Sequence, residues 1–328
     1  MKPIITVESL HKSFRRRKSR ERVQAVDDVS FEVERGEIMG LLGPNGAGKT
    51  TTIKMICALL IPDRGRVIVN GIDNRQDRCK ALRHISAVLE GNRNLYWRLT
   101  ARENLEYFAG NRGRSRRNVR NEIDNLLEQF NLADRADELV NALSRGMQQK
   151  LAIAVALLAH TDVVLLDEPT LGLDVETGYE VREILRDIVS EGRTILLSSH
   201  DMSVVQDLCR RTVIINHGRV VVNDEVTNLL RLFETRRYTV TLGKRPGERQ
   251  LARLKGTFPT VQLDLEGERA IISVDLEHAD DIYELIDILK SERTPIEAID
   301  RTTNNFEQVF RSLVNGAGEE PAEAHVIA

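Results

Sequence analysis

Short apolar runs alternate with amphipathic segments through the first two thirds of the chain. The run IMGLL at residues 38–42 predicts a buried strand, and the spacing of Thr51, Met55 and Leu59 behind it predicts a helix. The same alternation predicts buried strands at residues 163–167 and 194–197, and helices from about Arg145 and at residues 178–189. Strands that alternate with helices indicate a mainly parallel α/β sheet, with ligand sites at the strand ends.

Two further segments depart from this alternation. Residues 4–9 and 25–33 predict strands on either side of the basic run RRRKSRER at residues 15–22, which we interpret as an exposed hairpin tip rather than a binding patch. Residues from about Arg98 to Val140 are polar and charged with a helical period, which predicts a helical insertion. The first domain is therefore expected to carry antiparallel β and helical subdomains beside its parallel sheet.

The pattern restarts near Thr235. A strand at residues 238–242 is followed by helical, strand, strand, helical and strand patterns, an order that resembles a split βαβ, ferredoxin-like α+β module. A closing helix would place four apolar side chains on one face: Phe306, Val309, Phe310 and Leu313. We therefore expect a large domain over residues 1–234, a small accessory domain over residues 235–315 and a disordered tail over residues 316–328.

The overall composition narrows the class of protein. Lysine and arginine number 47 against 50 aspartate and glutamate residues, and the net charge of −3 argues against a nucleic-acid binder with a dominant basic face. The three cysteines, Cys57, Cys79 and Cys209, are widely spaced and form no metal-ligand pattern. A reducing, cytosolic setting without disulfides or zinc fits this usage.

The sequence predicts neither a secretory signal nor a membrane-spanning segment. The opening MKPIITVESL lacks the charged segment and long apolar core of a secretory signal. The longest apolar stretches, such as residues 151–159, are about half as long as a bilayer requires. If the protein works at a membrane, we expect another chain to cross it.

The strongest chemical motif is GPNGAGKTT at residues 43–51, which matches the phosphate-loop pattern G-x-x-x-x-G-K-[ST] between a strand and a helix. Its glycines allow successive backbone N–H groups to curl around phosphates, Lys49 supplies a charge to the outer phosphates, and the Thr50 hydroxyl coordinates magnesium. We predict that ATP binds to the whole loop: Gly43, Pro44, Asn45, Gly46, Ala47, Gly48, Lys49, Thr50 and Thr51.

Two consecutive acids follow the predicted strand at residues 163–167. Asp167 ends the strand and is expected to hold magnesium, directly or through water. Glu168 is placed to polarise the water that attacks the γ-phosphate, so Glu168 and Lys49 are the first catalytic candidates.

With these motifs, LSRGMQQK at residues 143–150 resembles the signature of the ATP-binding cassette (ABC) ATPases, whose pattern is LSGGQ. Leu143, Ser144 and Gly146 match, while Arg145 and Met147 depart from it, a variation seen among exporter ATPases. The resemblance implies a phosphate-loop NTPase fold of the ABC type. It also implies that Ser144, Gly146 and Met147 contact ATP held by a partner subunit, and the N–H groups at the start of a helix suit that contact.

Further segments follow the family order. GLD at residues 172–174 resembles the loop that contacts the partner subunit, and His200 resembles the switch histidine near the γ-phosphate, which makes it a third catalytic candidate. Phe14 stands where the family has an aromatic residue stacked on adenine, although an aromatic at this place can also be a core residue.

One family position carries a different residue. Glu90 stands where the family has a glutamine, and its carboxylate can reach magnesium together with Thr50 and Asp167 while adding negative charge near the phosphates. Downstream, Tyr96 and Trp97 lie in a region that faces the membrane subunit in the family, although aromatics packed under a loop would give the same sequence.

The resemblance implies an ATPase with ATP and Mg²⁺ as cofactors, working as a two-fold dimer on the inner face of the cell membrane. Its partners would be a second ATPase subunit and a separately encoded permease, with export as the direction and no nucleic acid involved. The alternative is a soluble ABC ATPase that acts on DNA or ribosomes, but the spacing from Lys49 to Ser144 leaves no room for a long coiled coil, and only one cassette is present. A phosphate-loop GTPase or kinase would lack LSRGM, and no N-K-x-D guanine motif is found.

Overall fold

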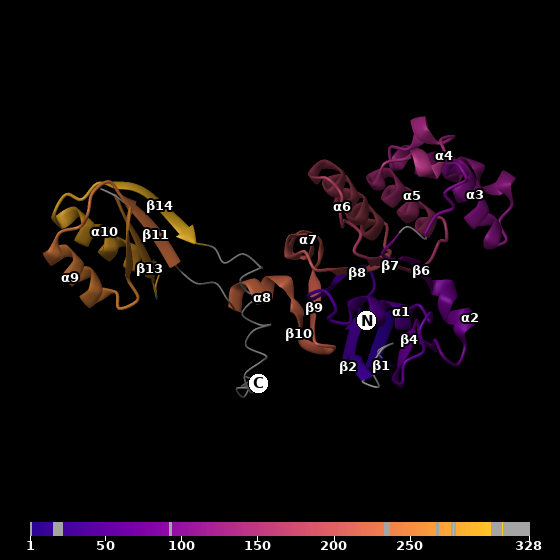
Figure 1. The fold of residues 1–328 in the computed structure, drawn as a ribbon, viewed down its shortest axis with the longest axis horizontal. Coiled ribbons are helices and arrows are strands. Elements are labelled where there is room, and N and C mark those ends of the chain that lie inside the picture. Colours follow the sequence, from indigo (N-terminus) through magenta and orange to yellow (C-terminus); the bar gives the residue numbers. More distant parts are fainter. Residues whose placement is uncertain are drawn as a thin grey trace. The chain divides into compact units, whose positions relative to one another are not determined.

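The computed structural model describes residues 2–15, 22–91, 94–232, 237–266, 269–276, 278, 280–302 and 310. These residues form two compact units, one up to Thr227 and one from Asn228 onward (Figure 1). The boundary predicted after residue 234 falls outside the described residues and stays a prediction. The interior of the basic run, most of the predicted closing helix and the tail over residues 316–328 also lie outside them.

A six-stranded sheet forms the centre of the first unit. Its order is β10-β9-β3-β8-β7-β6, and all neighbours are parallel except the antiparallel pair β9 and β10. The middle strands consist of apolar residues that are buried on both faces, as expected for a covered parallel sheet. The bounds are β3 Ile38–Leu42, β6 Ile85–Val88, β7 Val163–Asp167, β8 Thr194–Ser199, β9 Arg211–Asn216 and β10 Arg219–Glu225.

A second sheet of the same unit is antiparallel, with the order β2-β1-β4-β5. Its first two strands run further than predicted, so that the basic run begins directly at the strand ends. Apolar side chains from this sheet, from the central sheet and from the first helix share one core. The bounds are β1 Ile5–Arg15, β2 Arg22–Val33, β4 Arg64–Val69 and β5 Ile72–Asp73.

Helices connect the strands and form the predicted insertion. The insertion consists of α3 and α4, which pack on each other and on α5 (Figure 1). The bounds are α1 Lys49–Ile56, α2 Arg78–Ala81, α3 Ala101–Asn111, α4 Arg116–Gln129, α5 Arg145–Leu157, α6 Val175–Ser190, α7 Met202–Leu208 and α8 Val226–Leu232. Within the described part of the chain, no helix combines the length and the apolar character needed to cross a bilayer.

The second unit has the predicted βαββαβ order. Its antiparallel sheet, in the order β12-β13-β11-β14, has the strand arrangement of a ferredoxin-like module. Alternate residues such as Val240 and Ile272 point to a core shared with Leu285 and Leu289 of the second helix. The bounds are β11 Arg237–Leu242, α9 Glu248–Thr257, β12 Gln262–Glu266, β13 Arg269–Asp275, α10 Asp281–Ser291 and β14 Ile296–Thr302.

Candidate functional site

The loop between β3 and α1 requires glycine for its shape. A Cβ atom at Gly43 would lie 2.2 Å from the carbonyl oxygen of Ile215. At Gly48 the backbone has φ +110°, and a Cβ atom would lie 2.4 Å from the carbonyl oxygen of Ala25. Only glycine fits both places without displacing neighbouring backbone. The loop is therefore held against two strands and turns directly into α1 at Lys49.

This loop lines a pocket of about 380 Å³. The pocket volume is within the range that holds a ligand of nucleotide size. Three residues distant in sequence, Glu90, Glu168 and His200, face the loop across it. The complete lining is Ala25, Asn45, Gly46, Ala47, Gly48, Lys49, Thr50, Thr51, Glu90, Glu168, Leu171 and His200.

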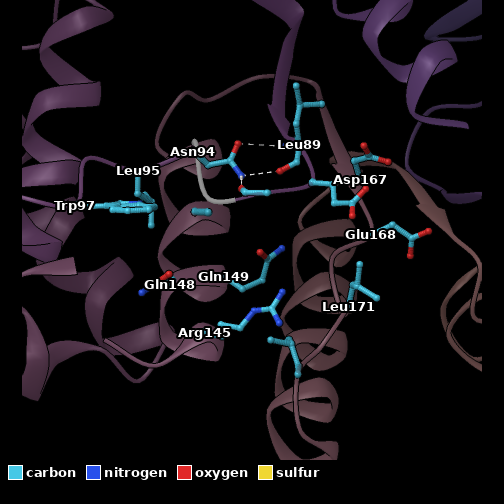
Figure 2. A pocket seen from close by; sticks show the side chains of 14 residues that line it. Leu89, Asn94, Leu95, Trp97, Arg145, Gln148, Gln149, Asp167, Glu168 and Leu171 are labelled. Carbon is cyan, nitrogen blue, oxygen red and sulfur yellow. Dashed lines mark hydrogen bonds between the residues drawn. The ribbon is translucent and has the colours of Figure 1, made fainter. Parts of the chain in front are cut away.

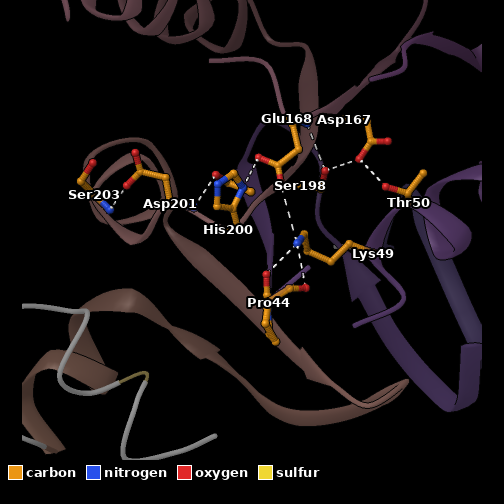
Figure 3. A network of polar contacts seen from close by, with 11 residues as sticks. Pro44, Lys49, Thr50, Asp167, Glu168, Ser198, His200, Asp201 and Ser203 are labelled. Carbon is orange, nitrogen blue, oxygen red and sulfur yellow. Dashed lines mark hydrogen bonds and ion pairs between the residues drawn. The ribbon is translucent and has the colours of Figure 1, made fainter. Parts of the chain in front are cut away.

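Lys49 is almost completely buried at the floor of this site. Its Nζ atom donates hydrogen bonds to the carbonyl oxygens of Gly43 at 2.6 Å and Pro44 at 3.3 Å, and lies 3.6 Å from Oε1 of Glu168 (Figure 3). Burial lowers the pKa of Lys49, and the nearby carboxylate charges oppose that shift. The ammonium is thus desolvated and held in place, which suits it to bind phosphate oxygens.

Asp167, at the end of β7, has the geometry of a metal ligand. Its Oδ1 atom accepts hydrogen bonds from Oγ of Ser198 at 2.5 Å and from Oγ1 of Thr50 at 3.1 Å. Its Oδ2 atom is buried and has no hydrogen-bond partner among the described residues. A buried carboxylate oxygen without a partner is costly unless it binds something, and a divalent cation would satisfy it.

The donor set fits Mg²⁺ in particular. Among the described residues there is no cluster of three or more histidine, cysteine, aspartate or glutamate side chains that would enclose a metal. Mg²⁺ is typically bound by one or two protein oxygens and completes its shell with phosphate oxygens and water. Thr50 and Asp167 would hold it, and Glu90, which lines the same pocket, is the third predicted ligand.

Glu168 is held in an uncommon backbone conformation. Its φ of +53° lies in the left-handed region, which costs on the order of 1 kcal/mol or more for a residue other than glycine. The surrounding structure compensates, because the backbone N–H donates to the carbonyl oxygen of Ser198 at 3.1 Å and to its hydroxyl at 3.2 Å. This conformation directs the buried carboxylate to Lys49 on one side and His200 on the other.

Ser198 is a site residue that the sequence did not reveal. It contacts both acidic residues at the end of β7, through its hydroxyl to Asp167 and through hydroxyl and carbonyl to the N–H of Glu168 (Figure 3). The available signal was the pair of serines at the end of a buried strand, in LLSSHD before His200. A buried hydroxyl at such a position needs a polar partner.

His200 follows β8 and faces Glu168. Its Nδ1 atom lies 3.0 Å from Oε2 of Glu168, but Nδ1 forms no well-directed hydrogen bond with any described residue. The two side chains are therefore close together without a directed hydrogen bond between them. The imidazole, which is more than a third exposed, can turn to donate to another acceptor in the pocket.

The loop that carries Glu90 is braced by a residue that sequence analysis missed. The Asn94 amide accepts from the N–H of Leu89 at 3.2 Å and donates to the carbonyl oxygens of Leu89 at 2.7 Å and Gly91 at 3.2 Å (Figure 2). Glu90 lines both the phosphate pocket and a second pocket of about 120 Å³, whose lining also includes Asp167 and Glu168. It therefore lies between the two pockets.

The predicted signature residues stand apart from the phosphate pocket of their own chain. Ser144 is exposed and caps α5, with its hydroxyl accepting from the N–H of Met147 at 3.2 Å. Gly146 has a packing role besides any ligand contact, because a Cβ atom there would lie 2.4 Å from Cγ2 of Thr177. None of the three signature residues belongs to the lining of the phosphate pocket.

Phe14 also lies outside the lining of the phosphate pocket. The side chain is 42% exposed at the end of β1, so it is not a core residue. The ammonium of Lys12 lies 5.9 Å from the centre of the Phe14 ring. Its predicted stacking on adenine stays a prediction.

Tyr96 and Trp97 are about half exposed rather than packed under a loop. Tyr96 contacts Tyr107 of α3 edge to face at 4.5 Å between ring centres, and their hydroxyls are 3.0 Å apart. Tyr96 and Phe108 also line a cleft of about 610 Å³ between the helical insertion and β6. An open cleft edged by exposed aromatic side chains is typical of a protein-binding surface.

A phosphate loop, a buried aspartate with a free oxygen and a glutamate beside a lysine and a histidine define a nucleotide-hydrolysing site of the phosphate-loop class. The family described as ABC transporter matches residues 26–171 of the chain. The ABC transporter ATP-binding protein NatA of Bacillus subtilis is 41% identical over 207 residues, which cover 63% of this chain and 84% of NatA. This chain belongs to the family of ABC transporter ATP-binding proteins, and it is an ABC ATPase.

Other relatives extend the comparison. The Nod factor export ATP-binding protein I of Ralstonia nicotianae is 36% identical over 228 residues, covering 70% of this chain and 69% of that protein. Among solved structures, the dimeric post-hydrolysis state of the ATP-binding cassette MJ0796 bound to ADP and Pi is 28% identical with a TM-score of 0.62. That match covers 68% of this chain and 98% of the cassette.

Proposed function

We propose that this chain is the ATPase subunit of an exporter, in which two copies close on ATP and Mg²⁺ and thereby drive a separate membrane permease. The observation that carries the proposal is that the phosphate loop, Asp167 and Glu168 form one site, while the signature residues of the same chain lie outside it. A site of this kind needs a second subunit to cover the γ-phosphate.

The start of α5 supports the paired arrangement. Ser144 is exposed and lies at the N-terminus of a thirteen-residue helix, where unpaired N–H groups favour an anion. Since the chain does not direct these groups into its own phosphate pocket, the phosphates of a facing subunit are the proposed ligand. The related cassette MJ0796 has been solved as a dimer with ADP and Pi.

The proposed reaction is in-line hydrolysis of the γ-phosphate. Glu168 accepts a proton from water while the water oxygen bonds to the γ-phosphorus, and the bond from that phosphorus to the β–γ bridging oxygen breaks to release ADP. Lys49 and His200 stabilise the charge on the γ-phosphate oxygens. Mg²⁺, held by Thr50 and Asp167, would neutralise charge on the phosphates.

The proposed permease contact is the aromatic cleft beside α3. Tyr96 and Trp97 project from the loop that follows Glu90, so a partner seated there touches the segment that leads to the phosphate pocket. A permease in the membrane would hold the ATPase on the cytoplasmic face. The export direction follows the relatives, one of which is named as a Nod factor export protein.

Replacing the proposed base tests this function. Glu168→Gln preserves shape and removes the proton acceptor, so we expect ATP binding to persist while turnover falls at least about a hundredfold, within the usual contribution of a general base. The variant with ATP and Mg²⁺ should accumulate as a dimer in analytical ultracentrifugation.

Glu191→Gln provides the matched control, because it makes the same chemical change at an exposed acid at the end of α6. It should behave as wild type. Turnover near the wild-type rate in Glu168→Gln would remove the role of Glu168. A variant that stays monomeric with ATP bound, even beside its permease, would contradict the paired arrangement.

A further inference from the structure

Arg145 is the residue at which the chain departs from the family signature immediately after Ser144. It begins α5 and is exposed, and within the described part of the chain it forms no ion pair or hydrogen bond. Its guanidinium nevertheless lies against the backbone of another segment. A Cβ atom built on Gly172 would be only 2.7 Å from Nη1 of Arg145.

Gly172 admits the guanidinium for two reasons. It has no side chain, and its φ of +70° lies in the left-handed region, which glycine adopts without strain. The absence of a side chain at Gly172 thus leaves the space that the guanidinium of Arg145 occupies.

The loop that receives Arg145 leads directly back to the proposed base. In this loop, the N–H of Leu171 donates to the carbonyl oxygen of Glu168 at 3.2 Å. The N–H of Leu173 donates to the carbonyl oxygen of Thr170 at 3.3 Å. Consecutive hydrogen-bonded turns make this short loop stiff. A displacement at Gly172 is consequently transmitted to Glu168, which is itself held in the left-handed conformation.

Two further contacts join α5 to the segment after this loop. Gly146 packs against Thr177 in the first turn of α6, where a Cβ atom would collide with the threonine methyl group. One turn later, the buried Lys150 forms an ion pair with Glu180. The start of α5 and the start of α6 are thus packed as one body, and Arg145 is the part of α5 that contacts the loop between Glu168 and α6.

The pocket that Arg145 lines is rich in acidic side chains. The pocket of about 120 Å³ that it lines also contains the carboxylates of Glu90, Asp167 and Glu168. Arg145 is the one positively charged side chain among the described residues of this lining. These carboxylates favour a positive charge in this pocket.

We infer that Arg145 is a positioning residue, which couples the occupancy of the partner's ATP site to the placement of Glu168 in its own site. The inference rests on the proposed function, because it takes Ser144 to bind the γ-phosphate of a facing subunit. A phosphate bound at Ser144 fixes the start of α5, Arg145 transmits that position to Gly172, and the loop places Glu168. Hydrolysis at one site then depends on ATP at the other.

The test is the dependence of ATPase rate on ATP concentration for the full chain with its permease. Wild type should show a Hill coefficient well above 1. Arg145→Ala should lower the Hill coefficient to about 1 and reduce kcat roughly tenfold, an intermediate effect for a residue that positions a catalytic group rather than reacting. The ATP dissociation constant from equilibrium binding should change less than twofold.

Arg117→Ala is the matched control, because Arg117 is an exposed arginine on α4 away from both pockets. It should leave rate and cooperativity unchanged. A double-mutant cycle adds a second measurement: Gly172→Ala should impair kcat less in the Arg145→Ala background, where the contact with the guanidinium is already absent and only the backbone strain at the φ of +70° remains.

Several results would overturn the inference. These are a wild-type Hill coefficient of 1, unchanged cooperativity in Arg145→Ala, and strictly additive effects in the cycle. A thousandfold loss of kcat would also overturn it, because that loss is expected of an arginine that contacts the phosphate directly. If wild type hydrolyses no ATP, or Glu168→Gln fails to trap a dimer, the proposed function itself is wrong; failure of the Arg145 test alone leaves it intact.

Discussion

The hydroxyl and carbonyl of Ser198 hold two acidic residues that have different proposed tasks. Asp167 accepts a hydrogen bond from the Ser198 hydroxyl, and the backbone N–H of Glu168 donates to the hydroxyl and the carbonyl oxygen of the same serine. One residue of β8 therefore sets the positions of the proposed metal ligand and the proposed base. The unusual backbone of Glu168 is stable because these contacts are made simultaneously.

Ser198→Ala should separate positioning from binding at this site. Removal of the hydroxyl leaves Thr50 as the remaining described partner of Oδ1 of Asp167. We therefore expect turnover to fall about tenfold and the Mg²⁺ concentration for half-maximal activity to rise, while ATP binding changes little. Steady-state ATPase assays over a range of Mg²⁺ concentrations measure this.

Ser86→Ala is the control for this prediction, because Ser86 is a buried serine of β6 whose hydroxyl pairs with that of Thr161 at 2.8 Å. It should cost a similar amount of stability without a shift in the Mg²⁺ requirement. If both variants respond alike to Mg²⁺, Ser198 has a structural role only.

At the scale of elements, the N-terminus of α5 has two roles. Its cap stabilises the helix, and the same turn is proposed to bind phosphate. Ser144 caps the helix through the N–H of Met147, and such a cap contributes about 1 kcal/mol. The helix is anchored at its other end, where Arg114 and Arg193 donate to the carbonyl oxygens of Leu158 and Leu157. The first turn is therefore presented from a firmly held helix.

Ser144→Ala should affect stability and function to different degrees. We expect the free energy of unfolding to fall by about 1 kcal/mol, as for loss of an N-cap, and ATPase activity to fall at least tenfold because the proposed phosphate contact in the dimer is lost. Thr100→Ala gives the comparison, since Thr100 caps α3 with a reciprocal capping box and lies outside the phosphate pocket. Equal loss of activity in the two variants would show that Ser144 acts only as a helix cap.

At the scale of the whole molecule, the two compact units have separate hydrophobic cores. The core of the first unit contains residues from both of its sheets and α1, and the core of the second contains residues from its own sheet and two helices. The described polar residues of the proposed ATP site all belong to the first unit. Each unit thus has the internal packing expected of an independently stable domain.

Calorimetry of the full chain should therefore give two unfolding transitions. ATP with Mg²⁺ at a hundred times its dissociation constant should stabilise the first unit by about 2.7 kcal/mol through linkage and leave the other transition in place. Glu168→Gln prevents consumption of the ligand during the scan. A single cooperative transition, or equal shifts of both, would show that the two units are coupled in unfolding.

Local patterns in the sequence were enough to predict the elements that carry the site. The phosphate loop was predicted from the spacing of its glycines, and Asp167 and Glu168 were predicted from their place at the end of a continuous apolar strand. Both features depend on neighbouring residues alone. The βαββαβ order of the second unit was predicted for the same reason, and its strand order agrees with a ferredoxin-like arrangement.

Contacts between distant segments were decided only by the tertiary structure. Ser198 lies thirty-one positions from Asp167, and Arg145 meets Gly172 only because α5 packs beside the start of α6. Exposure was likewise unpredictable for Phe14 and Tyr96, since an aromatic residue has the same local signal in a core and on a surface. Sequence patterns report which local structure a segment prefers, whereas side-chain partners depend on how the strands and helices pack.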